Sequence, residues 1–200
     1  MGYINIQLVD HTINPEDKIA AAASVSHDSA CNRERNLKRI HHLIANKHLS
    51  VLRFAYATFL IDGLSRACSH QLVRTAHAGM VQQSQRYVEC KDLNVVIPES
   101  IPNDSVAMWH INQVVNASRK CYEYLLSNGV EKEDARYFLL EGTTSKIIMT
   151  GNFQMWYEWI PKRTSDAAQA EIRNIADVIH KKLNNIAPNI FGGCSASYPT

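Results

Sequence analysis

The side chains with the clearest capacity for chemistry are arginines carried by separate segments of the chain. Arg74 and Arg86 flank a polar stretch, and Arg136 and Arg163 follow much later in the sequence. A guanidinium presents a planar fork of N–H donors that matches the oxygens of a phosphate. Arginines from distant segments therefore favour an anion site, while scattered surface arginines would give the same pattern.

Side-chain amides gather around Arg86. The surrounding residues include Gln71, Gln82, Gln83, Ser84 and Gln85. An amide carries both a donor and an acceptor, so it can bind the edge of a nucleobase. A solvated polar loop has the same composition, and both interpretations remain open.

Other kinds of active site are not indicated. Ser84 lies outside a G-x-S-x-G motif, and Cys68 and His70 are too close on a helix to face each other. The chain has no GxGxxG motif, no P-loop, and neither HExxH nor CxxC spacing, so we expect no metal site. The five widely spaced cysteines indicate reduced thiols, most of them buried.

Composition indicates one folded domain over residues 1–200. Hydrophobic residues make up 46% of the 200 residues and charged residues 20%, which is enough to bury a core. A net charge of +2 provides no field for nucleic acid. No apolar run approaches the ~20 residues of a membrane span, and the first residues lack a signal-peptide pattern. We expect a cytoplasmic protein that binds neither nucleic acid nor membranes.

Hydrophobic periodicity predicts the elements that must position these side chains. Alternation predicts strands over 3–9, 51–61 and 146–150. Helical spacing predicts helices over 18–25, 32–45, 64–73, 106–126, 132–139, from 152 to a stop near Pro161, and 166–183. Residues 74–92 are predicted to form a functional loop. Without strict βαβ alternation, the fold class is α+β, with a mixed sheet and long helices.

The residues around Arg86 carry a family resemblance. The run SRACSHQLVR…QQSQRYV, residues 65–88, resembles the flavin-dependent thymidylate synthases, which are α+β homotetramers with active sites built from several subunits. Their signature is Arg-His-Arg, two variable residues, Ser, four variable residues, Ser, one variable residue and Arg. Arg74, Ser84 and Arg86 match three of its six fixed positions.

Two further stretches extend the resemblance to about residues 50–190. Residues 147–173 resemble the family's C-terminal block, and Asp134-Ala135-Arg136 resembles the segment that supplies a phosphate-binding arginine. The resemblance implies a nucleotide site and a flavin site. Nucleotide-binding residues would be Gln71, Ser84, Gln85, Arg86, Arg136 and Arg163, with Ser84 and Arg163 catalytic. FAD-binding residues would be Arg74, His77 and Asn152.

The departures from the family pattern concentrate on the flavin side. Thr75, Ala76 and Gly79 replace the His, the second Arg and the first Ser of the signature. Arg53-Phe54 stands where the family usually has Glu-His, and Ala167 where it often has His. Each lost charge-assisted hydrogen bond costs about 1.5–3 kcal/mol. The pattern indicates a retained nucleotide pocket beside a rebuilt cofactor pocket.

The resemblance implies transfer of a one-carbon unit from methylenetetrahydrofolate to C5 of a pyrimidine nucleotide. The leading hypothesis is methylation of dUMP to dTMP with FAD and NADPH, in a homotetramer. One alternative is a flavin-independent C5-hydroxymethylase acting on dUMP, dCMP or UMP. Another is a non-catalytic relative that binds a nucleotide. The family's reaction requires no protein nucleophile, and this agrees with the absence of a nucleophile–base motif from the sequence.

Overall fold

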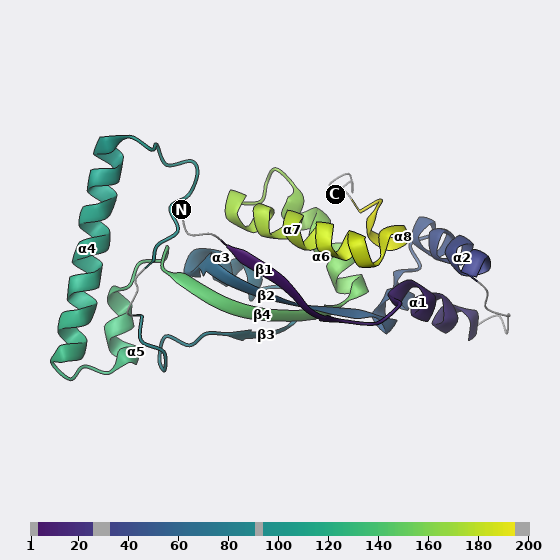
Figure 1. Ribbon diagram of the computed structural model, residues 1–200, viewed down its shortest axis with the longest axis horizontal. Helices are drawn as coiled ribbons and strands as arrows, with labels where there is room; N and C mark the ends of the chain where they lie inside the picture. The colour runs from purple at the N-terminus through teal and green to yellow at the C-terminus, as the bar shows by residue number, and fades with distance from the viewer. Residues whose placement is uncertain (1–3, 26–32, 91–93, 195–200) are drawn as a thin grey trace. The chain divides into compact units, whose positions relative to one another are not determined.

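The computed structural model describes residues 4–25, 33–90 and 94–194 (Figure 1). Four strands form one sheet in the order β1-β2-β4-β3. They are β1 (Asn5–His11), β2 (Tyr56–Ser65), β3 (Gly79–Gln82) and β4 (Thr144–Asn152). The expected α+β class with long helices is confirmed, and the sheet itself is antiparallel.

Helices follow the predicted positions closely. They are α1 (Pro15–Ser24), α2 (Arg33–Ala45), α3 (Arg66–Leu72), α4 (Ser105–Ser127), α5 (Lys132–Ala135), α6 (Phe153–Thr164), α7 (Ala170–Ile186) and α8 (Pro188–Phe191). The described residues also form two 3₁₀ turns, η2 (Leu49–Phe54) and η3 (Arg136–Phe138). Within the described ranges, no helix combines the length and the apolar character needed to cross a membrane.

The chain divides into two compact units. Among the described residues, one comprises 4–5, 61–73, 81–90 and 94–147, and the other comprises 6–25, 33–60, 74–80 and 148–194. We call them the α4 unit and the α6 unit, after the long helices that each contains. The expectation of a single domain over residues 1–200 stays a prediction.

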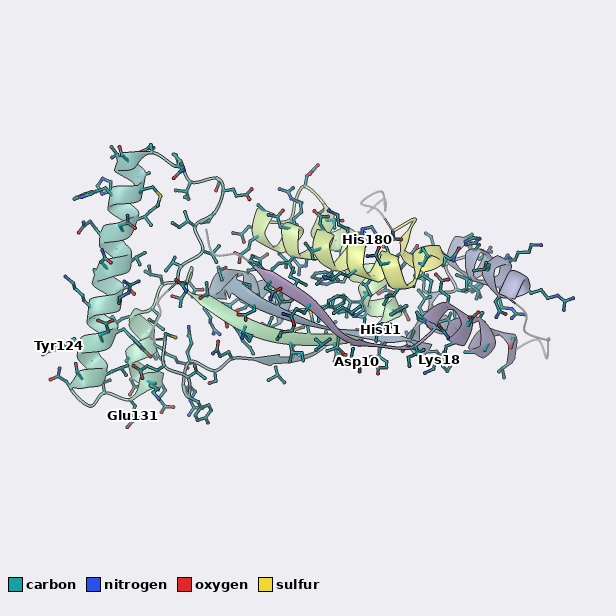
Figure 2. The ribbon with its side chains drawn as sticks, viewed as in Figure 1. Asp10, His11, Lys18, Tyr124, Glu131 and His180 are labelled. Carbon is teal, nitrogen blue, oxygen red and sulfur yellow. The ribbon has the colours of Figure 1, made fainter. Side chains whose placement is uncertain are left out.

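The α6 unit is organised around an aromatic core. Trp156 is fully buried on α6, and its indole Nε1 donates to the Ala57 carbonyl of β2 at 3.1 Å. Its ring packs edge-on against Phe59, with centroids 5.2 Å apart. α6 packs against α7, where His180 Nε2 donates to the Phe191 carbonyl of α8 at 2.8 Å (Figure 2). Trp156, Tyr157 and Trp159 are therefore core residues and do not form a stacking surface for a ligand.

The α4 unit is held together where α4 meets α5 and η3. Asp104 caps α4 by accepting from the backbone N–H groups of Val106 and Ala107 at 2.9 and 2.8 Å. Ser118 Oγ donates to the Phe138 carbonyl at 2.6 Å, and the buried Tyr122 packs with Ala135. These contacts fix the short segment that carries Arg136 against a long helix.

Besides the end of helix α6, three local predictions were wrong. Residues 51–54 form the end of η2, so the strand begins at Tyr56. The predicted loop 74–92 contains β3, whose four residues are too few to show alternation. Residues 136–138 continue α5 as a 3₁₀ turn. The strand predicted from Tyr3 and the helix predicted from Asn32 begin outside the described residues.

Helix α6 continues through Pro161 to Thr164, beyond the predicted stop. A proline in a helix lacks the N–H that would bond to the carbonyl four residues earlier, here that of Tyr157. That carbonyl instead accepts from the buried Cys194 thiol, with Sγ 3.4 Å away. Burial raises the pKa of Cys194 to about 12, so the thiol remains a donor at neutral pH. The helix tolerates proline because another segment supplies the missing donor.

Candidate functional site

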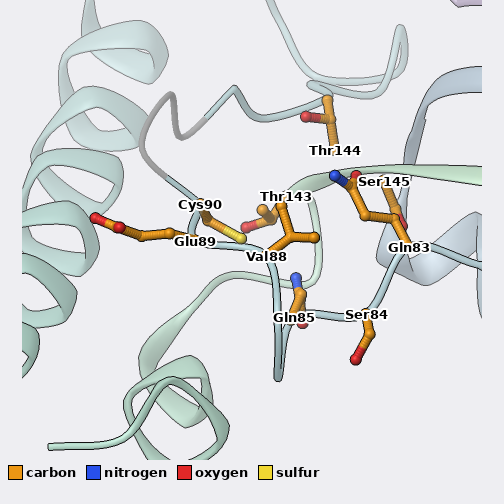
Figure 3. Close-up of a pocket in the computed structure, with 9 residues that line it drawn as sticks. All are labelled: Gln83, Ser84, Gln85, Val88, Glu89, Cys90, Thr143, Thr144 and Ser145. Carbon is orange, nitrogen blue, oxygen red and sulfur yellow. The ribbon is translucent and has the colours of Figure 1, made fainter.

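The first candidate site is a cavity in the α4 unit of about 360 Å³. It lies between the segment that follows β3 and the beginning of β4 (Figure 3). Its lining residues are Gln83, Ser84, Gln85, Val88, Glu89, Cys90, Thr143, Thr144 and Ser145. Ser84 and Gln85, both predicted to bind nucleotide, therefore lie on one cavity wall.

Gln82 connects the end of β3 to α3 and β4 through its side chain. Its Nε2 donates to Ser69 Oγ on α3 at 2.8 Å and to Ser145 Oγ on β4 at 3.0 Å. The next residue, Gln83, donates its backbone N–H to the Lys146 carbonyl at 2.8 Å. Because β3 is short, these hydrogen bonds are important contacts between the loop after β3 and β4.

Ser84 begins a tight turn. Its carbonyl accepts from the N–H groups of Tyr87 and Val88, at 3.2 and 2.9 Å. Its Oγ accepts from the Arg86 N–H at 3.2 Å, and the hydroxyl hydrogen can still be donated to a ligand. The turn places Ser84 at the cavity and Arg86 two residues further along the chain.

Arg86 and Arg136 meet at Glu133. Arg86 donates through Nε and Nη2 to Glu133 Oε2, each at 2.6 Å, and Arg136 Nε donates to the Glu133 carbonyl at 3.1 Å. The hydrogen bond and the charge of Glu133 raise the pKa of Arg86. Two arginines predicted to bind phosphate thus converge from distant segments, and Glu133 provides a carboxylate where an anion would bind.

The cavity wall also contains polar atoms without partners. Gln85 Nε2 and Thr143 Oγ1 are both buried and make no hydrogen bond. Cys90 is half-buried on the same wall, and burial is the main cause that raises its pKa. Sequence reasoning identified Gln85 but missed Thr143, because a lone threonine carries no motif. Buried polar groups are usually paired, so these atoms mark where a ligand would bind.

The remaining predicted nucleotide residues do not line this cavity. Gln71 lies on α3 in the same unit, and Arg163 lies near the end of α6 in the other unit. Both have partners of their own within the chain. Their roles remain predictions based on the resemblance.

A second cavity lies in the α6 unit. It has a volume of about 260 Å³ and is lined by Arg53, His77, Asn152, Gln154, Met155 and Glu158. His77 and Asn152, two of the predicted flavin residues, therefore share one cavity. Arg74 is exposed and is not among its described lining residues.

The polar groups of this second cavity are bonded to one another. Arg53 Nε donates to Gln154 Oε1 at 2.6 Å, and Gln154 Nε2 donates to Glu158 Oε1 at 2.7 Å. Asn152 Oδ1 caps α6 by accepting from the Met155 N–H at 2.9 Å. His77 adopts a left-handed backbone with φ of 62°. The replacement of the family's Glu-His by Arg53-Phe54 thus creates a bonded chain within the cavity.

Two of the departures from the signature lie beside this region. Thr75 Oγ1 is buried without a partner. A Cβ placed on Gly79 would lie 2.9 Å from Thr150 Cγ2, and the Thr150 hydroxyl accepts from Thr58 at 2.8 Å. The serine usual at this position would therefore require Thr150 to move.

Comparisons with known proteins identify the family. A family model described as "Thymidylate synthase complementing protein" matches residues 7–189. The chain belongs to this family, Thy1. Among Thy1 relatives, the flavin-dependent thymidylate synthase of Mycobacteroides abscessus is 37% identical over 172 residues, covering 78% of this chain and 69% of that protein. The corresponding enzyme of Mycobacterium tuberculosis is 33% identical over 171 residues, covering 78% and 68%.

A solved structure shares the Thy1 fold of this chain. It is a UMP/dUMP methylase, PolB, from Streptomyces cacaoi, bound with 5-Br dUMP. The TM-score is 0.81 at 20% sequence identity, over 96% of this chain and 94% of the other. The resemblance seen in the sequence is thereby confirmed at the level of family and fold.

The Thy1 family implies FAD, and the second cavity fits part of such a group. Arg53, His77 and the Asn152 amide can supply donors for phosphate or carbonyl oxygens. A volume of 260 Å³ lies below the roughly 300–1,000 Å³ typical of small-molecule sites. This cavity would therefore enclose only a portion of FAD. Among the residues that the structure describes, no cluster of three or more His, Cys, Asp or Glu could hold a metal.

Proposed function

We propose that this chain catalyses reductive methylation of a pyrimidine nucleotide at C5, with dUMP converted to dTMP. Methylenetetrahydrofolate donates the one-carbon unit, and NADPH supplies the electrons by way of FAD. The observation that carries this proposal, in a member of Thy1, is that Ser84 lines the first cavity while the neighbouring Arg86 contacts Glu133, the same residue that Arg136 contacts. A nucleotide phosphate would find two guanidinium groups and a hydroxyl there.

The chain's own residues would position and polarise the nucleotide. Arg86, Arg136 and the Ser84 hydroxyl hold the phosphate, while Gln71 and Arg163 hold the nucleoside. A cationic Arg163 beside the base would stabilise negative charge that develops on the ring as C5 becomes nucleophilic. The side chains serve by binding and orientation, so no protein nucleophile is required.

The second cavity would contribute to the cofactor site. His77 and Asn152, together with Arg74, would hold FAD, and Arg53 adds a cation to the same wall. When bound, FAD supplies the hydride that converts the transferred carbon into a methyl group. Because Arg53 is already bonded to Gln154, cofactor binding would have to rearrange that contact.

The proposal includes an assembly and a location. We propose a homotetramer with active sites shared between subunits, in which each subunit is one domain, and a cytoplasmic location. In this proposal the ligands are the pyrimidine nucleotide, the folate and the two redox cofactors, without nucleic acid or membrane contacts. Support comes from the family and from a charge balance of 21 basic against 19 acidic residues.

The first experiment combines spectroscopy with product analysis. The purified protein is saturated with FAD, freed of excess, and examined for a retained flavin absorption band. It is then supplied with dUMP, methylenetetrahydrofolate and NADPH. Formation of dTMP that depends on both FAD and NADPH would support the proposal. Hydroxymethylated nucleotide formed with folate alone would replace it with the hydroxymethylase. Nucleotide binding without any product would indicate a non-catalytic relative.

A further inference from the structure

Thr143 is an unusual residue in the first cavity. It is 2% exposed, and its backbone is fully used, with N–H donating to Leu140 at 2.9 Å and carbonyl accepting from the Arg66 N–H at 3.0 Å. Its Oγ1, however, is buried and bonds to nothing. A folded chain loses stability when a hydroxyl is desolvated without a partner, and valine would avoid that cost.

Gln85 repeats the pattern from another segment. Its Nε2 is buried and makes no hydrogen bond, and the residue lies in the turn that follows β3. In Figure 3 the amide nitrogen points in the direction of Val88 and Thr143. A donor from the loop and a hydroxyl from the segment leading into β4 therefore lie unused on the same cavity wall.

Apart from Ser84, the residues that line this cavity are poorly suited to a phosphate. Hydroxyls of Ser84, Thr144 and Ser145 line it with the Cys90 thiol, and its charged member, Glu89, is acidic. The cations Arg86 and Arg136 are not among the lining residues and meet at Glu133 instead. The division indicates one region for an anion and another for uncharged oxygens.

We propose that Gln85 Nε2 and Thr143 Oγ1 bind an uncharged oxygen of the nucleotide, either a sugar hydroxyl or a base carbonyl. This inference rests on the proposed function, because it assumes that the phosphate binds at Ser84, Arg86 and Arg136. It assigns specificity to two side chains other than the proposed phosphate contacts. Thr143 thereby gains the partner that it lacks within the chain.

The test compares Thr143→Val with a matched threonine. Valine keeps the shape of threonine and removes the hydroxyl. Binding of dUMP, UMP and dCMP is measured by titration calorimetry, and the melting temperature is measured without ligand. We expect Thr143→Val to weaken nucleotide binding by about ten-fold and to leave the melting temperature unchanged or raised.

The control is Thr12→Val. Thr12 is also buried, but its Oγ1 accepts from the Tyr56 N–H at 3.0 Å. Here we expect a lower melting temperature and unchanged nucleotide affinity. Two further variants complete the series. Thr143→Ser restores a hydroxyl and should recover binding, whereas Gln85→Leu should weaken binding to a degree similar to that of Thr143→Val.

The three nucleotides distinguish the source of the oxygen. A loss confined to UMP identifies the 2′-hydroxyl, and a loss for dUMP and UMP but not dCMP identifies the C4 carbonyl. An equal loss for all three identifies a group that they share, the 3′-hydroxyl or the C2 carbonyl. Unchanged affinity in both Thr143→Val and Gln85→Leu overturns the inference alone. A wild-type protein that binds none of the three overturns the proposed function and the inference with it.

Discussion

The two cavities differ in how their polar groups are used. In the first, Gln85 Nε2 and Thr143 Oγ1 are buried without partners. In the second, Arg53, Gln154 and Glu158 form a chain of hydrogen bonds of 2.6 and 2.7 Å. The first cavity keeps hydrogen-bonding capacity for a ligand, whereas much of that capacity in the second is satisfied internally.

The difference has an energetic meaning. A ligand that pairs unsatisfied buried atoms gains hydrogen bonds without breaking any in the protein. A ligand of the second cavity must exchange existing bonds for new ones, so its net gain is smaller. This contrast agrees with the sequence, in which positions resembling the nucleotide site are retained and positions on the flavin side are changed.

The largest effect would come from Arg163, which lies outside both cavities. If its predicted role is right, Arg163→Ala removes a cation from the developing charge and lowers kcat by about 10²–10³-fold. Steady-state assay of dTMP formation measures this loss, and circular dichroism checks the fold. Lys162→Ala, a neighbouring cation on α6, is the control and should retain full activity. Equal activity of the two variants would show that roles cannot be transferred residue by residue from the family to this chain.

Asn152 allows the second cavity to be tested in two parts. Asn152→Ala removes both the cap of α6 and the amide donor, whereas Asn152→Asp keeps an oxygen for the Met155 N–H. We expect both variants to bind FAD about ten-fold more weakly, and only Asn152→Ala to lose about 1 kcal/mol of stability. Flavin absorbance titration and chemical denaturation measure the two quantities. If Asn152→Asp retains normal FAD affinity, the residue serves the helix alone.

Cys90 reports on occupancy of the first cavity. Burial, the largest cause, raises its pKa, so the thiol stays protonated to a higher pH than a free cysteine. Alkylation should therefore be slow near pH 8, should accelerate as the pH rises toward the raised pKa, and should slow several-fold when dUMP is bound. Mass spectrometry after iodoacetamide treatment measures modification at this residue. The buried Cys194 provides an internal reference that nucleotide should not affect.

The smallest expected effect concerns Glu133. Its carboxylate forms an ion pair with the Arg86 guanidinium, and both side chains are about half exposed. Glu133→Gln removes the competing charge and should tighten dUMP binding by about two- to five-fold, within the range of an exposed ion pair. Binding titrations at low and high salt measure the change, which should shrink as salt screens the pair. Weaker binding in this variant would mean that Glu133 positions Arg86 for the ligand.

The sequence indicated candidate site residues where it carries a strong local pattern. Ser84, Gln85 and Arg86 fall in a recognisable motif, and Arg136 follows a second one. The structure places Ser84 and Gln85 on the first cavity and brings Arg86 and Arg136 to Glu133, while their roles stay predictions. Thr143 could not be predicted, because its importance comes from burial and the absence of a partner for its hydroxyl. The bonded chain from Arg53 to Glu158 was also missed, since its members are separated by 101 residues between Arg53 and Gln154.

The fold shows the same distinction. Long amphipathic helices such as α4 and α7 were predicted closely because periodicity over many residues is a robust signal. β3 escaped prediction because four residues are defined by pairing in the sheet. Helix α6 was predicted too short because the donor that compensates for Pro161 comes from Cys194.

The contact between Tyr157 and Cys194 also imposes an order in time. The thiol donor lies 37 residues after the carbonyl that it serves. At synthesis rates of about 5–20 residues per second, roughly 2–7 s separate the appearance of the two groups. During that interval the Cys194 thiol is not yet available to the Tyr157 carbonyl. The hydrogen bond between Cys194 and the Tyr157 carbonyl in α6 can therefore form only late in the synthesis of the chain.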